Sequence, residues 1–189
     1  DDWGGALMNI TELCYNLRLP YARENWQQLL REAKHTKQDH ETFLANLLEA
    51  EWRLRLEKGQ VRRIKEAKFP LKKYLCDFKR DKYDAVFLPK FEELEELHFI
   101  PNKENIILLG TSGAGKTHYA IALGIAACMK GHSVLFATVP NLIVELKETM
   151  SNNALSNYRK RFEKYDLVIL DELGYVSMDK SGCEIDRKS

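Results

Sequence analysis

Eight consecutive residues near the middle of the chain have the types and spacing of a phosphate-binding loop, GxxxxGK[ST]. They are, in order, Gly110, Thr111, Ser112, Gly113, Ala114, Gly115, Lys116 and Thr117. The glycines allow backbone N–H groups to turn inward around an anion, and a helix that begins at the loop adds partial positive charge. Lys116 can then reach the β- and γ-phosphates, and the Thr117 hydroxyl can bind Mg²⁺. The pattern predicts a binding site for a nucleoside triphosphate.

Two neighbouring acids supply the second part of this predicted site. Asp171 and Glu172 end an apolar run, residues 167–170, that lies downstream of the loop. We expect Asp171 to hold Mg²⁺, usually through water, and Glu172 to act as the general base that polarises the attacking water. Lys116 and Glu172 are therefore the predicted catalytic residues, and Thr117 and Asp171 the predicted metal ligands.

The pair of acids also distinguishes between enzyme classes. A small-molecule kinase needs no water-activating Glu after its Mg²⁺-binding Asp, so the pair favours an ATPase. A GTPase would carry the motif NKxD downstream of the loop, whereas residues 102–105 (NKEN) lie upstream of it and lack the Asp. We therefore expect the base to be adenine and the cofactors to be ATP and Mg²⁺.

Alternating apolar runs and helical stretches are predicted to position these residues. The run before the loop, 105–109, is typical of a buried parallel strand, and the loop opens into a helix that closes at Gly131. The elements expected after it are a strand over 133–138, a helix from Pro140 to about Met150, a helix over 155–164 and a strand over 165–172. This order is typical of an α/β fold with a parallel sheet.

The N-terminal part of the chain reads differently. Residues 8–70 carry apolar side chains at helical spacing, with Asp39 as an expected N-cap, and so predict a small helical domain. The expected organisation is an upstream or non-native leader over 1–7 before Met8, the helical domain over 8–70, a linker over 71–104 and a partial P-loop core over 105–189.

A basic segment, residues 53–73, covers the end of this helical part. Its cations are Arg53, Arg55, Lys58, Arg62, Arg63, Lys65, Lys68, Lys72 and Lys73, against only Glu57 and Glu66. Such a run is either a solvated helix face or a surface that contacts DNA phosphates. Few aromatic residues lie nearby to stack on bases, so duplex DNA is the more consistent nucleic-acid partner.

Composition limits the class of protein. The chain has 189 residues, a net charge of +1, 30% charged residues and 44% hydrophobic residues, which is typical of a globular protein. No apolar run is long enough to span a bilayer, and no secretory signal opens the chain. The cysteines, Cys14, Cys76, Cys128 and Cys183, have no metal-site spacing. We expect a cytoplasmic protein with reduced thiols.

Two stretches resemble a known family. LLGTSGAGKTHYAIAL over 108–123 and DLVILDELGYV over 166–176 are similar to the IstB-like ATPases that assist transposition of insertion sequences, relatives of the DnaC helicase loader in the AAA+ superfamily. LRLP over 17–20 and LCDF over 75–78 resemble that family's N-terminal opening and its linker. The resemblance covers residues 8–185.

This resemblance implies a P-loop AAA+ sheet preceded by a small helical domain. It also implies an ATP-dependent homo-oligomer that encircles or clamps duplex DNA and activates a transposase. Lys116, Thr117, Asp171 and Glu172 match the family's nucleotide and hydrolysis residues. Two alternatives remain: a helicase loader in replication, which would carry the same nucleotide residues, and a non-catalytic remnant that only binds DNA or a partner through its helical half.

The sequence departs from the family pattern after residue 185, where it reads Asp186, Arg187, Lys188 and Ser189. The family continues there with a helix, a sensor strand that lies between the loop strand and the acid-bearing strand, and arginines that complete a neighbour's ATP site. We therefore expect a C-terminally truncated chain whose sheet is incomplete, with unpaired backbone groups. Such a chain would bind ATP but be deficient in hydrolysis.

Overall fold

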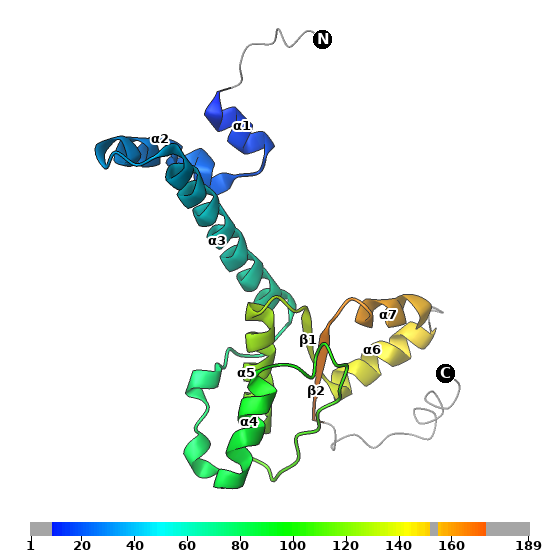
Figure 1. Cartoon of the computed structure of the whole chain (residues 1–189). Coiled ribbons are helices and arrows are strands. Elements are labelled where there is room, and N and C mark those ends of the chain that lie inside the picture. The colour runs from blue at the N-terminus through cyan, green and yellow to red at the C-terminus, as the bar shows by residue number, and fades with distance from the viewer. Residues whose placement is uncertain (1–8, 152–154, 173–189) are drawn as a thin grey trace. The chain divides into compact units, whose positions relative to one another are not determined.

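The computed structural model describes residues 9–151 and 155–172 (Figure 1). The expected leader over 1–7 and the stretch over 173–189 lie outside the described residues. The chain divides into an N-terminal unit, residues 1–59, and a C-terminal unit, residues 60–189. None of the described helices is both long and apolar enough to cross a bilayer.

Local capping explains where the first and third helices of the N-terminal unit begin. This unit holds α1 (Ile10–Asn16), α2 (Pro20–His35) and the first part of α3 (His40–Glu66). Asn9 and Glu12 form a capping box at α1. The Asp39 carboxylate accepts from the Thr42 backbone N–H at 2.9 Å, which confirms the N-cap predicted there.

The start of α2 is capped by a side chain from another helix. Its own N-cap residue, Leu19, makes no side-chain cap. Instead the buried Glu51 carboxylate on α3 accepts from the backbone N–H groups of Tyr21 at 2.8 Å and Ala22 at 3.2 Å. Arg55 places its Nε 3.6 Å from Glu51 Oε1 and donates to the Arg18 carbonyl at 2.7 Å. One buried carboxylate on α3 therefore caps the start of α2.

We expect Glu51→Ala to lower the free energy of unfolding of the N-terminal unit by about 2 kcal/mol, because two helix N–H groups and Arg55 lose a buried partner. Glu49→Ala is the matched control on the same helix. Glu49 pairs with Arg53 at 2.6 Å on the exposed surface, so its loss should cost about 0.5 kcal/mol or less. Urea denaturation followed by circular dichroism measures both. Equal losses would contradict the capping role.

The C-terminal unit combines helices with a short parallel sheet. Its elements are the 3₁₀ turns η1 (Leu75–Asp77), η2 (Arg80–Lys82) and η3 (Ala85–Phe87), then α4 (Leu88–Glu95), α5 (Lys116–Met129), β1 (Val134–Thr138), α6 (Val139–Ser151), α7 (Leu155–Phe162) and β2 (Leu167–Asp171). β1 pairs with β2 in parallel, with Val134 opposite Leu167 and Thr138 opposite Asp171. The predicted fold class, an α/β P-loop fold with an incomplete parallel sheet, is confirmed.

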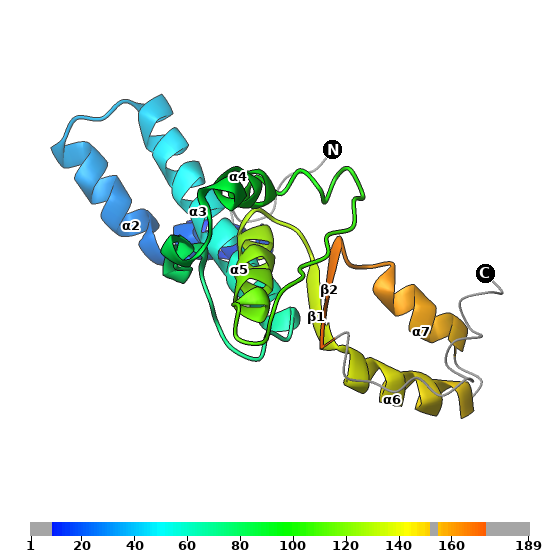
Figure 2. The ribbon, with the colours of Figure 1, turned by 90° about the horizontal axis from the view of Figure 1, so that it is seen from below.

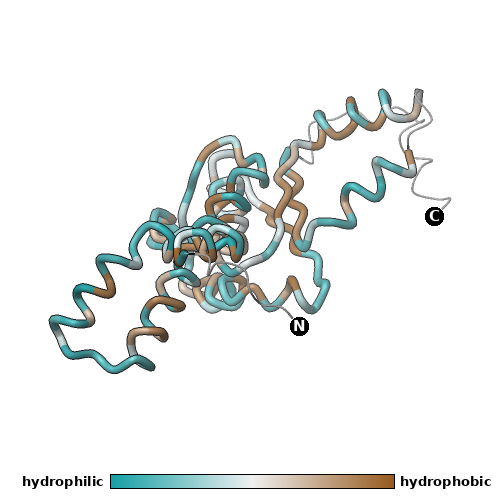
Figure 3. Tube along the Cα trace, turned by 90° about the horizontal axis from the view of Figure 1, so that it is seen from above, coloured by the Kyte–Doolittle hydropathy of each residue, from teal (hydrophilic) through white to brown (hydrophobic). Residues whose placement is uncertain are grey.

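The loop helix α5 forms the centre of this unit. Helix α5 packs against β1 and β2, while α6 and α7 lie side by side beyond the strands (Figure 2). Both strands are strongly hydrophobic, whereas α7 is mostly hydrophilic (Figure 3). Gly124 allows the close approach, because a Cβ there would lie 2.6 Å from Ile169 Cδ1. The core on both sides of this contact includes Ile121, Ile125 and Leu135, each at most 1% exposed.

The strand expected over 105–109 does not form, so that prediction was wrong. Ile107 is 76% exposed and Leu109 is 89% exposed, and the segment belongs to no strand. The outer edge of β1 is already occupied, because the Phe136 N–H donates to the Ala67 carbonyl at 2.8 Å. Within the part of the chain that the structure describes, no strand connects 105–109 to β2. An apolar run without a hydrogen-bonding neighbour does not become a strand.

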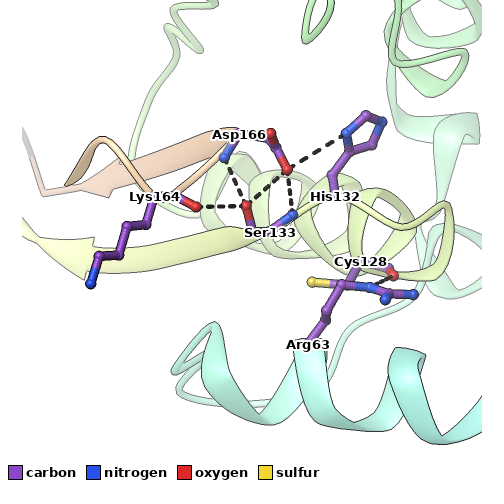
Figure 4. Close-up of polar contacts among 6 residues, drawn as sticks. All are labelled: Arg63, Cys128, His132, Ser133, Lys164 and Asp166. Carbon is purple, nitrogen blue, oxygen red and sulfur yellow. Dashed lines mark hydrogen bonds and ion pairs between the residues drawn. The ribbon is translucent and has the colours of Figure 1, made fainter. Parts of the chain in front are cut away.

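A polar clasp joins the starts of the two strands (Figure 4). The Asp166 carboxylate accepts from the Ser133 backbone N–H at 2.7 Å and from the Ser133 hydroxyl at 2.8 Å. The Ser133 hydroxyl oxygen also lies 3.0 Å from the Lys164 carbonyl oxygen, and His132 Nδ1 lies 4.0 Å from an Asp166 carboxylate oxygen. Hydrogen bonds from Ser133 lower the pKa of Asp166: the bond from its backbone N–H has the larger effect, and the bond from its hydroxyl the smaller. The clasp sets the register of β2 against β1.

We expect Asp166→Asn to destabilise the C-terminal unit at neutral pH, since a carboxylate accepts these bonds more strongly than an amide. The folded pKa of Asp166 lies below its ordinary value of 3.8. Its contribution is therefore present above that value and is lost as the pH falls through the folded pKa. Thermal unfolding of both proteins between about pH 3 and pH 7 should show a stability difference that narrows below about pH 4. A difference that stays constant over this range would contradict the role of the charge.

Candidate functional site

The last two residues of the 110–117 loop, Lys116 and Thr117, are also the first two residues of α5. The N-terminus of this helix therefore points at the space beside the loop. Gly113 and Gly115 have φ angles of 78° and 83°, a conformation that side chains with a Cβ rarely adopt. Gly115 is the N-cap of α5 and offers no side-chain cap. The N–H groups of the first helical turn therefore have no intrahelical acceptor, which is the arrangement that binds anions.

Lys116 turns back over its own loop. Its Nζ donates to the carbonyls of Gly110 at 2.9 Å and Thr111 at 2.8 Å, so the ammonium lies over the turn that leads into α5. An ammonium has three donors, and bonds to a phosphate are stronger than bonds to neutral carbonyls. The position is therefore suited to a lysine that exchanges loop carbonyls for phosphate oxygens.

Thr117 and Asp171 meet in space as the two motifs require. The Thr117 hydroxyl lies 3.0 Å from both carboxylate oxygens of Asp171. Asp171 reaches it because β2 ends there, with its last residue opposite Thr138 at the carboxyl edge of the sheet. Parallel sheets bind ligands at this edge.

The oxygens of this pair fit Mg²⁺. A hydroxyl and a carboxylate are hard oxygen ligands, and Mg²⁺ commonly takes only one or two protein ligands with waters and phosphates completing its shell. The described residues contain no cluster of three or more His, Cys, Asp or Glu side chains that could form an all-protein metal cage. Thr117 and Asp171 would hold the ion, which would neutralise charge on the phosphates.

Glu172 follows directly after β2. Its φ angle is 64°, a left-handed backbone conformation that is uncommon for a residue with a side chain and that clusters at functional sites. Its side chain is exposed. The predicted general base therefore sits at the carboxyl edge of the sheet, one residue beyond the predicted metal ligand.

The basic segment is partly engaged in contacts within the chain. In the N-terminal unit, Arg53 and Arg55 bind Glu49 and the Glu51 cap, respectively. In the C-terminal unit, Arg63 Nε donates to the Cys128 carbonyl at 2.7 Å, which caps the end of α5 (Figure 4). Five cations of this segment are exposed, and their side chains make no hydrogen bond or ion pair with the described residues: Lys58, Arg62, Lys65, Lys68 and Lys72.

Two aromatic residues that sequence reasoning assigned only to the linker contact the loop directly. The Tyr83 hydroxyl donates to the Ala114 carbonyl, and a Cβ at Gly115 would lie 3.3 Å from Phe78 Cε2. His118, in the first turn of α5, packs edge-on against Phe78. The signal in the sequence was the density of aromatic residues between 69 and 99.

The chain matches a family model over nearly its whole length. Residues 12–185 match the model described as IstB-like ATP binding protein.

Curated relatives agree with that match. The chain is 34% identical over 173 residues to an ATP-binding protein named for insertion sequence IS21 of Pseudomonas aeruginosa; the match covers 89% of this chain and 63% of the relative. It is also 34% identical over 170 residues to one named for IS5376 of Geobacillus stearothermophilus, covering 90% of this chain and 68% of the relative. The chain thus spans about two thirds of the length of these relatives.

Proposed function

The chain belongs to the family of IstB-like ATP-binding proteins, and we propose that it binds ATP with Mg²⁺ at the 110–117 loop and serves as a helper of DNA transposition. In this role the ATP-bound protein would assemble on duplex DNA and activate a transposase. The relatives are named as ATP-binding proteins of insertion sequences, which supports this assignment over other P-loop functions.

One contact carries the nucleotide part of the proposal. Thr117 Oγ1 and the Asp171 carboxylate lie 3.0 Å apart although they are separated by 54 positions in the chain. A glycine-rich turn alone would not bring an acid to the hydroxyl beside its lysine. Together with the uncapped start of α5, the contact supports a cation site next to an anion site, as a metal–nucleotide complex requires.

We further propose that this chain binds ATP but hydrolyses it slowly. The loop, Lys116 and the Thr117–Asp171 pair are in place, whereas the segment that enters the loop, 105–109, joins no strand. Turnover depends on positioning the attacking water to within fractions of an ångström, and a loop anchored to the sheet on only one side is poorly suited to that. Glu172 would polarise the water when it does react.

A helicase loader in replication is the second candidate, because its nucleotide residues would be the same. The two relatives described above are named as insertion-sequence proteins, which favours transposition. A remnant that only binds DNA or a partner is distinguished by its indifference to the loop lysine.

We expect Lys116→Ala to weaken binding of a fluorescent ATP analogue by about 10- to 100-fold, the contribution of charge-assisted hydrogen bonds. Lys130→Ala is the matched control at the other end of the same helix, where Nζ donates to the Glu95 and Glu96 carbonyls. The affinity of this variant for the analogue should stay within about twofold of wild type. Fluorescence titration measures both. Wild-type protein that fails to bind the analogue, or a Lys116→Ala variant that binds as well, would overturn the proposal.

Duplex-DNA binding tests the second half of the function. We expect Mg²⁺–ATP to strengthen binding of a labelled duplex in fluorescence anisotropy, and Lys116→Ala to abolish that gain. Alanine at Arg62, Lys65 and Lys68 should weaken binding and flatten its salt dependence, because phosphate contacts release counterions. DNA binding that is present but indifferent to ATP and to Lys116 would identify a passive binder instead.

A further inference from the structure

A cluster of aromatic rings packs against the phosphate-binding loop from the side of the segment between η1 and α4. Phe78, Tyr83, Phe91 and Tyr119 contact one another with ring centroids 4.8 to 5.5 Å apart. Phe78 and Tyr119 are buried, and Tyr83 and Phe91 are half-buried. Offset and edge-on ring pairs at these distances hold each other in defined orientations. The cluster is therefore a rigid support at the start of α5.

Tyr83 extends from this support to the loop backbone. Its hydroxyl donates to the carbonyl of Ala114, the residue just before the N-cap of α5. At the next position, a Cβ on Gly115 would lie 3.0 Å from the Tyr83 hydroxyl oxygen and 3.3 Å from Phe78 Cε2. The loop is thus in van der Waals contact with the cluster as well as hydrogen-bonded to it.

This bond determines which way a neighbouring donor points. The Ala114 carbonyl and the Gly115 N–H belong to one planar trans peptide group, so they point in opposite directions. A hydroxyl that holds the carbonyl toward the aromatic cluster therefore holds the N–H away from the cluster. Phosphate-binding loops depend on backbone N–H groups that converge on the anion.

We propose that Tyr83 is a positioning residue for nucleotide binding. It fixes the Ala114–Gly115 peptide group so that the Gly115 N–H is oriented before the phosphate arrives. The proposal rests on the proposed ATP-binding function and adds to it a residue far from the motif in sequence. Preorganisation of this kind raises affinity because the loop loses less conformational freedom on binding.

The test is Tyr83→Phe, which keeps the ring and its packing but removes the hydroxyl. We expect affinity for the fluorescent ATP analogue to fall by about 3- to 10-fold, the effect of one neutral hydrogen bond. The unfolding midpoint without nucleotide should change little, since the ring stays in the cluster. Hydrogen exchange of the 110–117 peptide should speed up relative to wild type, while exchange of β1 stays the same.

Tyr119→Phe is the matched control. It removes a hydroxyl from the same cluster, but that hydroxyl donates to the Phe91 carbonyl at 3.2 Å and not to the loop. Its affinity for the analogue should remain within about twofold of wild type. Equal losses in the two variants would show that the cluster acts only through general packing and would overturn the proposal.

The outcomes separate this inference from the function it rests on. If the wild-type chain fails to bind the analogue, the proposed function is wrong. If wild type binds, Lys116→Ala binds more weakly, and Tyr83→Phe binds as wild type does with unchanged exchange of the loop, the function stands and the role of Tyr83 is wrong. The exchange measurement also decides the matter if Tyr83→Phe is less stable overall, because β1 then serves as its internal reference.

Discussion

The parallel pairing of β1 with β2 is the constraint on which the site depends. Asp171 is the last residue of β2, so the direction and register of that strand decide whether its carboxylate reaches the Thr117 hydroxyl. The Ser133–Asp166 clasp sets the register at one end of the strands, and the close approach of α5 at Gly124 sets the height of the loop helix above them. A shift of one residue would turn Asp171 to the opposite face of the sheet.

The cations of the basic segment fall into two groups, one that binds groups within the chain and one that stays exposed. Arg55 and Arg63 donate to backbone carbonyls that lie far away in sequence, and each such bond adds a donor to a carbonyl at a turn or at a helix end. Because these two side chains are engaged within the chain, they are poor candidates for contacts with DNA phosphates. The exposed cations Arg62, Lys65 and Lys68 are then the better candidates for a nucleic-acid surface.

The segment before the loop illustrates the limit of local pattern. Residues 105–109 have the composition of a buried strand, and Leu109 is nevertheless 89% exposed. Composition states only that a segment could be buried; a strand also needs a neighbour to bond its backbone. The contacts that the loop does make are with α5, which begins at its end, and with Tyr83 and Phe78 of the aromatic cluster.

The sequence by itself determined the loop, the two acids, the order of helices and strands after the loop, the Asp39 cap and the family. These features are local: a cap, a glycine turn or a helical period depends on residues a few positions apart. Only the tertiary structure decided that Glu51 caps α2, that Arg63 caps α5, that Tyr83 supports the loop and that 105–109 forms no strand. Each of these depends on backbone groups brought together from distant parts of the chain, and residue type and spacing alone do not specify which of them will meet.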